Sequence, residues 1–196
     1  MQDIRICYIG DSFVNGTGDP SMLGWTGRVS AWSQNEEREI THYNLGVRRE
    51  TSADILIRWK TECALRFRDE AEYYVVFSFG VNDGVIEEGK ARISLEESIA
   101  NTRAILLEAK ALYKVLMVGP VGIDDEKVNR GINVRDEAFE ALCREMEISY
   151  IKQYYITKES EVFQKEVGAN DGAHPREKGY TLMAKSIFED ARWFFS

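Results

Sequence analysis

Segments patterned as β-strands alternate with segments patterned as α-helices along nearly the whole chain. The strand-like segments are short, apolar and often β-branched, and they cover residues 4–9, 40–45, 73–79, 115–118 and 148–151. Residues 73–79 are almost continuously apolar, which is typical of a strand buried on both faces of a sheet. Strands that alternate with helices predict a parallel sheet with helices on both of its faces.

The helix-like segments carry apolar residues at helical spacing. They cover residues 25–34, 52–72, 95–112, 132–146, 159–166 and 176–194. We expect Trp25 to pack beneath the loop after the first strand, and the spacing of Trp32 and Trp59 predicts that both lie in the core. Neither a repeat nor a linker interrupts the pattern, so we expect one domain over residues 1–196.

Charge and composition argue against several classes of function. The chain carries 33 acidic and 25 basic residues, a net charge of −8, which disfavours binding to nucleic acid or to an anionic membrane surface. The three cysteines have the spacing of neither a disulfide framework nor a metal site, and we expect no metal and no other cofactor. The sequence shows no basic and apolar leader and no apolar run of about 20 residues, which predicts a cytoplasmic protein without membrane insertion.

Polar residues follow three of the predicted strands at the point where each strand ends. Ser12 follows the first strand, Gly46 ends the second, and Asn82 follows the third. A further pair, Asp171 and His174, lies in the loop before the last predicted helix. Because functional groups of such sheets collect at the carboxyl ends of the strands, we expect these residues to meet at one edge.

Ser12, His174 and Asp171 have the chemistry of a nucleophile, its base and the group that orients the base. A serine hydroxyl needs an adjacent base to become an effective nucleophile. Of the two histidines, His42 lies within a predicted strand, whereas His174 lies in a loop at the start of a helix. A carboxylate three residues before His174 is placed to fold back onto the imidazole and fix its tautomer.

Three groups are candidate donors to the oxyanion that forms during attack by Ser12. They are the backbone N–H groups of Ser12 and Gly46 and the side-chain amide of Asn82. Each such donor is worth about 3–4 kcal/mol in the transition state. Glycine at position 46 leaves room for the backbone to approach the reacting atom. Each motif alone is typical of an ordinary turn, but their joint occurrence at strand ends favours a catalytic site.

Together these motifs resemble the four signature regions of the GDSL (SGNH) hydrolases. The regions are Gly10-Asp11-Ser12, Gly46, Gly80-x-Asn82-Asp83 and Asp171-x-x-His174, and they follow the family's order over nearly the whole chain. The resemblance implies a flavodoxin-like three-layer α/β/α sandwich with a five-stranded parallel sheet, and ester or thioester hydrolysis without a metal. It implies Ser12 as nucleophile and first oxyanion donor, Gly46 and Asn82 as the other donors, His174 as base and Asp171 as its orienting group.

Some residues depart from the family pattern or allow a simpler interpretation. Phe13 stands where the motif that names the family has leucine, a change that bears on the shape of the acyl site more than on activity. Arg48 and Arg49 are within reach of an anionic substrate group, although a solvated pair is the simpler interpretation. The acidic residues 124–126 are interpreted as a solvated loop. The Gly-x-Ser-x-Gly elbow of α/β-hydrolases is absent.

Several functions are compatible with this pattern. The predicted reaction is hydrolysis of carboxylic esters or thioesters of small or short-acyl substrates through an acyl-enzyme on Ser12. A carbohydrate O-deacetylase, a thioesterase or a lysophospholipase would carry the same motifs. A non-catalytic flavodoxin-like binding module is the alternative from another class, because small polar residues in 10–18 suit a phosphate or a flavin. Such a module has no need for Asp171 and His174, which separates the two hypotheses.

Overall fold

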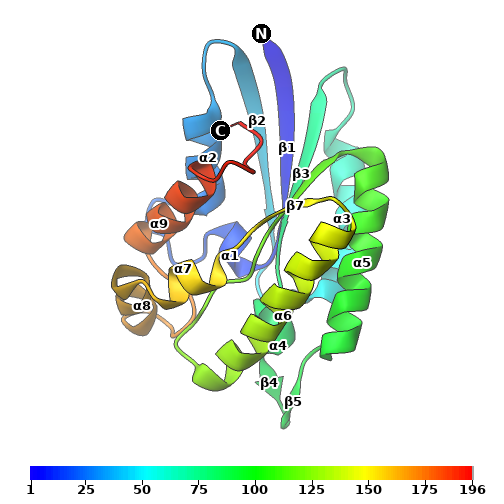
Figure 1. Ribbon diagram of the computed structural model, residues 1–196. Helices are drawn as coiled ribbons and strands as arrows, with labels where there is room; N and C mark the ends of the chain where they lie inside the picture. The colour runs from blue at the N-terminus through cyan, green and yellow to red at the C-terminus, as the bar shows by residue number, and fades with distance from the viewer. Residues whose placement is uncertain (196) are drawn as a thin grey trace.

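Five parallel strands form the central sheet of this computed structural model, which describes residues 1–195. The strand order across the sheet is β2-β1-β3-β6-β7 (Figure 1). The strands are β1 (Gln2–Gly10), β2 (Arg38–Gly46), β3 (Glu72–Ser78), β6 (Lys114–Val118) and β7 (Ser149–Ile151). Every pairing between neighbours in this sheet is parallel, so the predicted five-stranded parallel sheet is confirmed.

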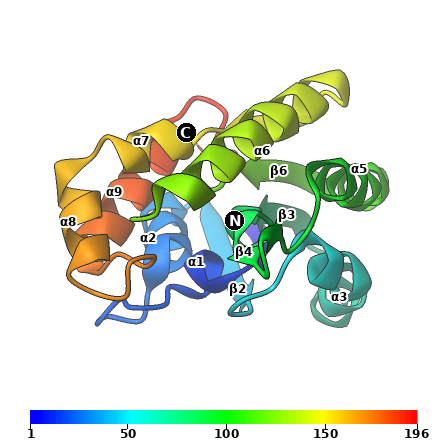
Figure 2. The same ribbon diagram turned by 90° about the horizontal axis from the view of Figure 1, so that it is seen from below.

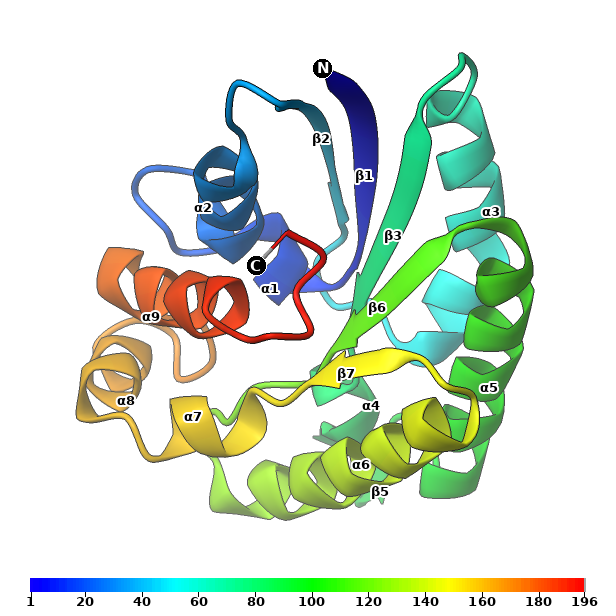
Figure 3. The same ribbon diagram turned by 45° about the horizontal axis from the view of Figure 1, so that its top comes forward.

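Helices cover both faces of the sheet, as Figures 1 and 3 show. One face carries α3 (Ser52–Arg66), α5 (Leu95–Leu112) and α6 (Glu126–Glu145). The other carries α2 (Gly24–Ser33) and α9 (Glu177–Phe188), with α7 (Tyr154–Lys158) and α8 (Glu161–Gly168) beside α9. This is the three-layer α/β/α arrangement. Within residues 1–195, none of the helices combines the length and apolar composition needed to cross a membrane.

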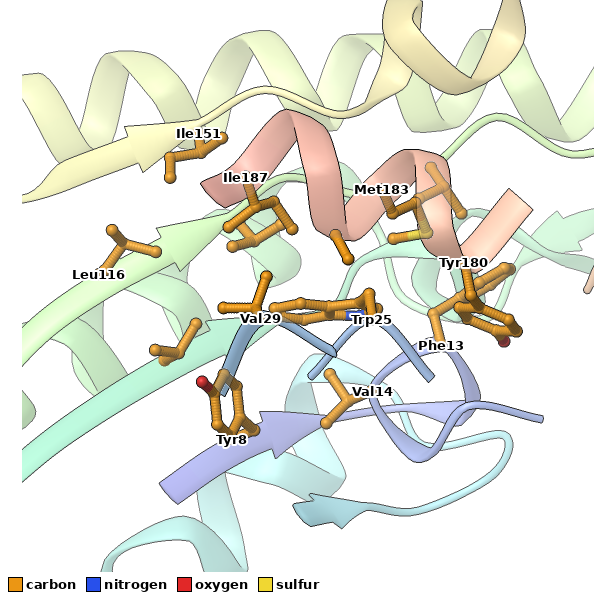
Figure 4. Packing of buried hydrophobic residues seen from close by; sticks show 14 of the residues in the cluster. Tyr8, Phe13, Val14, Trp25, Val29, Leu116, Ile151, Tyr180, Met183 and Ile187 are labelled. Carbon is orange, nitrogen blue, oxygen red and sulfur yellow. The ribbon is translucent and has the colours of Figure 1, made fainter. Parts of the chain in front are cut away.

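Alternate residues of each strand point to opposite faces, so the sheet has an apolar core on each side. On β1, Ile6 and Tyr8 lie in the core shared with α2 and α9, whereas Cys7 and Ile9 lie in the core shared with α3 and α5. Figure 4 shows the first core, in which Trp25 lies between β1 and α9.

Three tryptophans were expected to be buried, and the structure confirms this for two of them. Trp25 and Trp59 are fully buried. Trp32 is 42% exposed, so its predicted place in the core is wrong. It lies in the last turn of α2 and packs against Phe188 at the end of α9, where the core meets solvent (ring centroids 5.8 Å apart).

Some helix boundaries differ from the sequence-based expectation. The helix predicted over 52–72 ends at Arg66, and the one predicted to reach 194 ends at Phe188. The helix predicted to start at 132 starts at Glu126, because Asp125 Oδ1 accepts hydrogen bonds from two N–H groups of its first turn. Asp124 and Asp125 thus lie in an exposed loop, as expected, whereas Glu126 is the first residue of α6, which corrects the interpretation for that residue.

The loops after β1, β2 and β3 emerge together at the carboxyl edge of the sheet, which Figure 2 views from below. This edge carries short elements that the sequence pattern did not predict: α1 (Ser12–Asn15), α4 (Val81–Gly84), β4 (Ile86–Glu87) and β5 (Lys90–Ala91). The chain adds β2 on one side of β1 and β3 on the other, so the strand order reverses at β1. Ser12 follows β1 and thus lies at the switch point, where open parallel sheets bind ligands.

Candidate active site

Ser12, His174 and Asp171 form one hydrogen-bonded row. His174 Nε2 lies 2.7 Å from Ser12 Oγ, and His174 Nδ1 lies 2.7 Å from Asp171 Oδ2. These contacts fit the tautomer in which Nδ1–H donates to Asp171 and Nε2 accepts from the serine hydroxyl. The structure therefore brings together the three residues that the sequence singled out as nucleophile, base and orienting group.

Local packing fixes the position of Ser12 at the start of α1. Asp11 caps this short helix, and its Oδ1 accepts a hydrogen bond from the Phe13 N–H at 2.9 Å. Gly10 is tightly enclosed, because a Cβ at this position would lie 1.9 Å from the Ser78 carbonyl oxygen. Val14 is fully buried in the core below. Ser12 is consequently held at the edge of the sheet with 4% of its surface exposed.

The turn that carries His174 is fixed by the carboxylate of Asp171. Oδ1 of Asp171 accepts hydrogen bonds from the N–H groups of His174 (2.8 Å) and Ala173 (3.1 Å). Phe13 packs against the imidazole, with ring centroids 4.9 Å apart. Phe13 is itself buried in the core, so its bulk supports the histidine as well as bordering the site.

The electrostatic surroundings of Asp171 favour its charged form. Partial burial opposes ionisation, but the two N–H donors and the imidazole outweigh it and hold the pKa of Asp171 below its ordinary value. A carboxylate in this position stabilises the imidazolium that forms when His174 takes up a proton.

Asn82 lies beside the nucleophile at the start of α4. Its Nδ2 donates to the Glu50 carbonyl oxygen at 3.0 Å and makes a longer contact of 3.4 Å with Asp11 Oδ2. Asp83 anchors the same short helix, because its two oxygens accept from the Ser52 N–H (2.8 Å) and the Ser98 hydroxyl (2.5 Å). The contact to Asp11 brings the Asn82 amide close to the residue that precedes Ser12.

The N–H of Gly46 is already hydrogen-bonded within the protein. It donates to Asn44 Oδ1 at 3.0 Å. A Cβ at position 46 would lie 2.1 Å from the Asn15 backbone nitrogen, so glycine is required here for α1 to pack on the end of β2. The geometry therefore does not support the prediction that Gly46 offers a free donor to the oxyanion.

The turn after Gly46 contains a backbone donor that the sequence analysis missed. Glu50 N–H donates to the Val47 carbonyl at 3.4 Å, and Arg49 between them has a left-handed backbone with φ of 69°. Such a conformation costs a non-glycine residue about 1–2 kcal/mol, and strain of this kind is concentrated at functional sites. Within residues 1–195, the Arg49 N–H has no hydrogen-bond partner. Arginine gives no sequence signal for this conformation.

Asp11 is a buried carboxylate one residue before Ser12. Burial raises the pKa of Asp11 to about 7, and the nearby carboxylates of Asp83 and Glu50 add to this effect, although the Phe13 N–H opposes it. No ion pair to a basic residue compensates its charge within the described part of the chain. The group next to the candidate nucleophile thus titrates near neutral pH.

An open cleft of about 420 Å³ adjoins the loop that follows α1. Residues 15–19, Met22, Asn44 and Arg48 line it, and we call it the Arg48 cleft. No three His, Cys, Asp or Glu side chains between residues 1 and 195 are grouped to hold a metal ion.

Comparison with known proteins places the chain among GDSL-type proteins. The profile of the GDSL-like lipase/acylhydrolase family matches residues 8–182. The uncharacterized protein YpmR of Bacillus subtilis is 24% identical, over 96% of this chain and 81% of its own length.

Two solved structures share the fold. A member of the lipolytic protein G-D-S-L family from Veillonella parvula aligns with a TM-score of 0.74 at 21% identity, over 96% of this chain and 98% of its own. A catalytic mutant of Axe2, an acetylxylan esterase from Geobacillus stearothermophilus, aligns with a TM-score of 0.80 at 19% identity, over 98% of this chain and 94% of its own. Together with the profile match, the row of Ser12, His174 and Asp171 leads to one assignment: the chain belongs to the GDSL-like lipase/acylhydrolase family.

Proposed function

We propose that this protein hydrolyses carboxylic esters of small or short-acyl substrates through an acyl-enzyme on Ser12. Family membership supports an esterase-type acyl hydrolase. The observation that carries the specific proposal is the 2.7 Å contact between Ser12 Oγ and His174 Nε2, with His174 oriented by Asp171. A nucleophile within hydrogen-bond reach of a base that a third group orients is the arrangement that serine hydrolysis requires.

The reaction proceeds in two acyl transfers. Ser12 Oγ attacks the ester carbonyl while His174 takes up the hydroxyl proton. The tetrahedral intermediate collapses with cleavage of the bond to the alcohol oxygen, and His174 returns its proton to the leaving alcohol. Water then enters, gives a proton to His174 and attacks the acyl-enzyme. The bond from the acyl carbon to Ser12 Oγ breaks, His174 returns the proton to Oγ, and the acid is released.

The oxyanion is stabilised by hydrogen-bond donors around Ser12. We assign this role to the Ser12 N–H, the Asn82 amide and the Arg49 N–H, which takes the place first given to Gly46. Asn82 donates to Glu50, the residue next to Arg49, and this contact supports a common location for the two donors.

A carbohydrate O-deacetylase is the second candidate. The Arg48 cleft, with its open volume of about 420 Å³, leaves room for a sugar alcohol. The similarity of fold to an acetylxylan esterase is compatible with it. Thioesters and lysophospholipids are the remaining substrates that an assay must separate. A non-catalytic binding module offers no reason for the contact of Ser12 with His174.

Hydrolysis of p-nitrophenyl esters of increasing acyl length tests the proposal. We expect turnover of the acetate and short homologues, and Ser12→Ala to lower kcat on the order of 10⁴-fold or more. Ser30→Ala is the matched control, because Ser30 is another buried serine whose hydroxyl contacts Tyr8 at 2.8 Å, away from the site. Equal turnover by wild type and Ser12→Ala would show that Ser12 is not the nucleophile.

A further inference from the structure

The Arg48 cleft lies next to the histidine that must protonate the leaving alcohol. Gly18 in its wall packs against the turn of His174, since a Cβ at Gly18 would lie 3.5 Å from His174 Cβ. The same wall is fixed by Tyr180, whose hydroxyl donates to the Thr17 carbonyl at 2.8 Å. Asn82, the side-chain donor assigned to the oxyanion, is anchored elsewhere, on Glu50. The cleft is therefore placed to receive the alcohol part of the ester.

Most polar groups of the cleft are already occupied by other parts of the protein. The Thr17 hydroxyl donates to Asn15 Oδ1 at 3.1 Å, and Asn44 Nδ2 donates to the Val14 carbonyl at 2.8 Å. The carboxylate of Asp19 is buried in an ion pair with Arg28. It also accepts from the N–H groups of Ser21 and Gly24, so its charge is compensated.

Among the residues that line the cleft, Arg48 carries the positive charge. Within residues 1–195 it has neither an ion pair nor a side-chain hydrogen bond. Its neighbour Arg49 is different, because its guanidinium pairs with Glu87 at 3.3 Å. A guanidinium offers several N–H donors in one plane and matches the oxygens of a carboxylate or a phosphate.

We propose that the Arg48 cleft binds the alcohol part of the substrate and that Arg48 recognises an anionic group on it, a carboxylate or a phosphate. This proposal rests on the proposed esterase function and narrows its substrate class. The cleft volume of about 420 Å³ lies in the range of small-molecule sites, roughly 300–1,000 Å³, so the proposed alcohol is small. Its negative charge is inferred from Arg48. Arg48 is exposed, as the interpretation of a solvated residue expects, and the proposal adds an anionic ligand for it.

Acetate esters of para-substituted phenols that carry different charges test the proposal, because the comparison of wild type with Arg48→Gln cancels the intrinsic reactivity of each ester. The substrates are 4-acetoxybenzoate, its neutral methyl ester and 4-acetoxyphenyl phosphate, and kcat/KM is measured for wild type and Arg48→Gln. We expect wild type to prefer at least one anionic ester over the neutral one by about 10-fold, and Arg48→Gln to lose this preference because its kcat/KM falls about 10-fold more for that anionic ester than for the neutral one. The two anionic esters distinguish a carboxylate from a phosphate.

Arg176→Gln is the matched control, because it also removes an exposed positive charge near His174 but lies outside the Arg48 cleft. It should keep the preference. The proposal is overturned if wild type shows no preference for an anionic ester, or if Arg48→Gln keeps that preference. It is also overturned if Arg48→Gln lowers kcat/KM for 4-nitrophenyl hemisuccinate, whose charge lies on the acyl side. Ser12→Ala distinguishes failure of the esterase mechanism from failure of the Arg48 proposal. Full activity of Ser12→Ala overturns the esterase mechanism. If Ser12→Ala is inactive and wild type shows no preference for an anionic ester, only the assignment of Arg48 is overturned.

Discussion

At the scale of single residues, Asp11 is an acidic side chain in a buried position, where charged groups are rare. Its two oxygens face N–H donors, the Phe13 N–H at 2.9 Å and the Asn82 amide at 3.4 Å. The ionised carboxylate accepts from both donors more strongly than a protonated carboxyl does, so these contacts favour the charged form. Burial nevertheless raises the pKa of Asp11 to about 7, so hydrogen bonding and desolvation oppose each other at this residue.

The pKa of Asp11 predicts how protein stability depends on pH. Its folded-state value lies above the ordinary value of 3.8, so folding takes up a proton between these two values. The contribution of Asp11 to stability therefore falls as pH rises toward 7. Asp11→Asn imitates the protonated form. Between about pH 5.5 and about pH 8.5, wild type should lose about 2 kcal/mol more free energy of unfolding than this variant.

Urea unfolding at the two pH values measures this difference. Asp124→Asn is the control, because Asp124 is an exposed aspartate and its replacement should leave the pH dependence as in wild type. Identical pH dependence in wild type and Asp11→Asn would contradict the high pKa of Asp11.

The sequence predicted the side chains of the site better than its backbone donors. Ser12 and His174 were recognisable because a nucleophilic serine requires a base. Of the two histidines, His42 lies within a predicted strand, whereas His174 lies in a loop at the start of a helix, where a site can form. An oxyanion donor was expected at Gly46 because glycine suggests an accessible N–H, whereas the Gly46 N–H donates to Asn44 Oδ1. The direction of a backbone N–H depends on the turn, and the turn at Arg49 uses a left-handed residue that is not glycine.

At the scale of secondary-structure elements, Arg58 of α3 joins the carboxyl ends of two strands. Its Nη2 donates to the carbonyl oxygens of Leu45 (2.9 Å) at the end of β2 and Gly10 (3.2 Å) at the end of β1. Its Nε donates to Glu50 Oε2 at 2.7 Å. Because the Glu50 carbonyl receives the Asn82 amide, Arg58 links the strand end before Ser12 to the proposed oxyanion donor Asn82.

Replacing Arg58 by lysine should disturb catalysis more than substrate binding. Lysine keeps the charge but loses the planar set of donors, so the strand ends are no longer held together. We expect Arg58→Lys to lower kcat about 10-fold with a smaller change in KM, and to lower the free energy of unfolding by about 1–2 kcal/mol. Steady-state kinetics and urea unfolding measure both effects.

Arg66→Lys is the control for this prediction, since Arg66 lies on the same helix and pairs with Glu62 away from the strand ends. Its kcat should match that of wild type. A kcat for Arg58→Lys equal to that of Arg66→Lys would show that Arg58 does not position the site.

The long elements were predictable and the short ones were not. Buried strands and helices of ten or more residues display their periodicity in the sequence. The four-residue helices α1 and α4 are too short to display a period, yet they carry Ser12 and Asn82. The start of α6 was missed because the cap at Asp125 precedes the apolar stripe of the helix.

At the scale of the whole molecule, the alternation of strands and helices dictates where the site forms. Parallel strands place their carboxyl ends at one edge, and the reversal of strand order at β1 opens that edge beside Ser12. His174 reaches Ser12 across 162 positions of sequence because α9 packs on the same face as α2. The placement of these residues at the carboxyl edge could be predicted from the strand pattern and from serine chemistry, and the family resemblance supported it.

The proposed chemistry needs only side chains and backbone groups of the chain, so chelation should leave it intact. No grouping of three His, Cys, Asp or Glu side chains suited to a metal exists in the described residues 1–195. After treatment with EDTA and gel filtration, we expect kcat/KM to stay within about two-fold of the untreated value. Activity that is lost on chelation and restored by a divalent cation would contradict a metal-independent mechanism.

Covalent labelling of the nucleophile tests the central claim most directly. Wild-type protein is incubated with a fluorophosphonate, digested with trypsin and analysed by mass spectrometry with fragmentation of the peptide that contains Ser12. The mechanism predicts one phosphonyl group on Ser12, none in Ser12→Ala, and labelling slowed at least about 10³-fold in His174→Ala. A label on another residue, or labelling of Ser12 at the same rate without His174, would contradict an acyl-enzyme formed by Ser12 with His174 as its base.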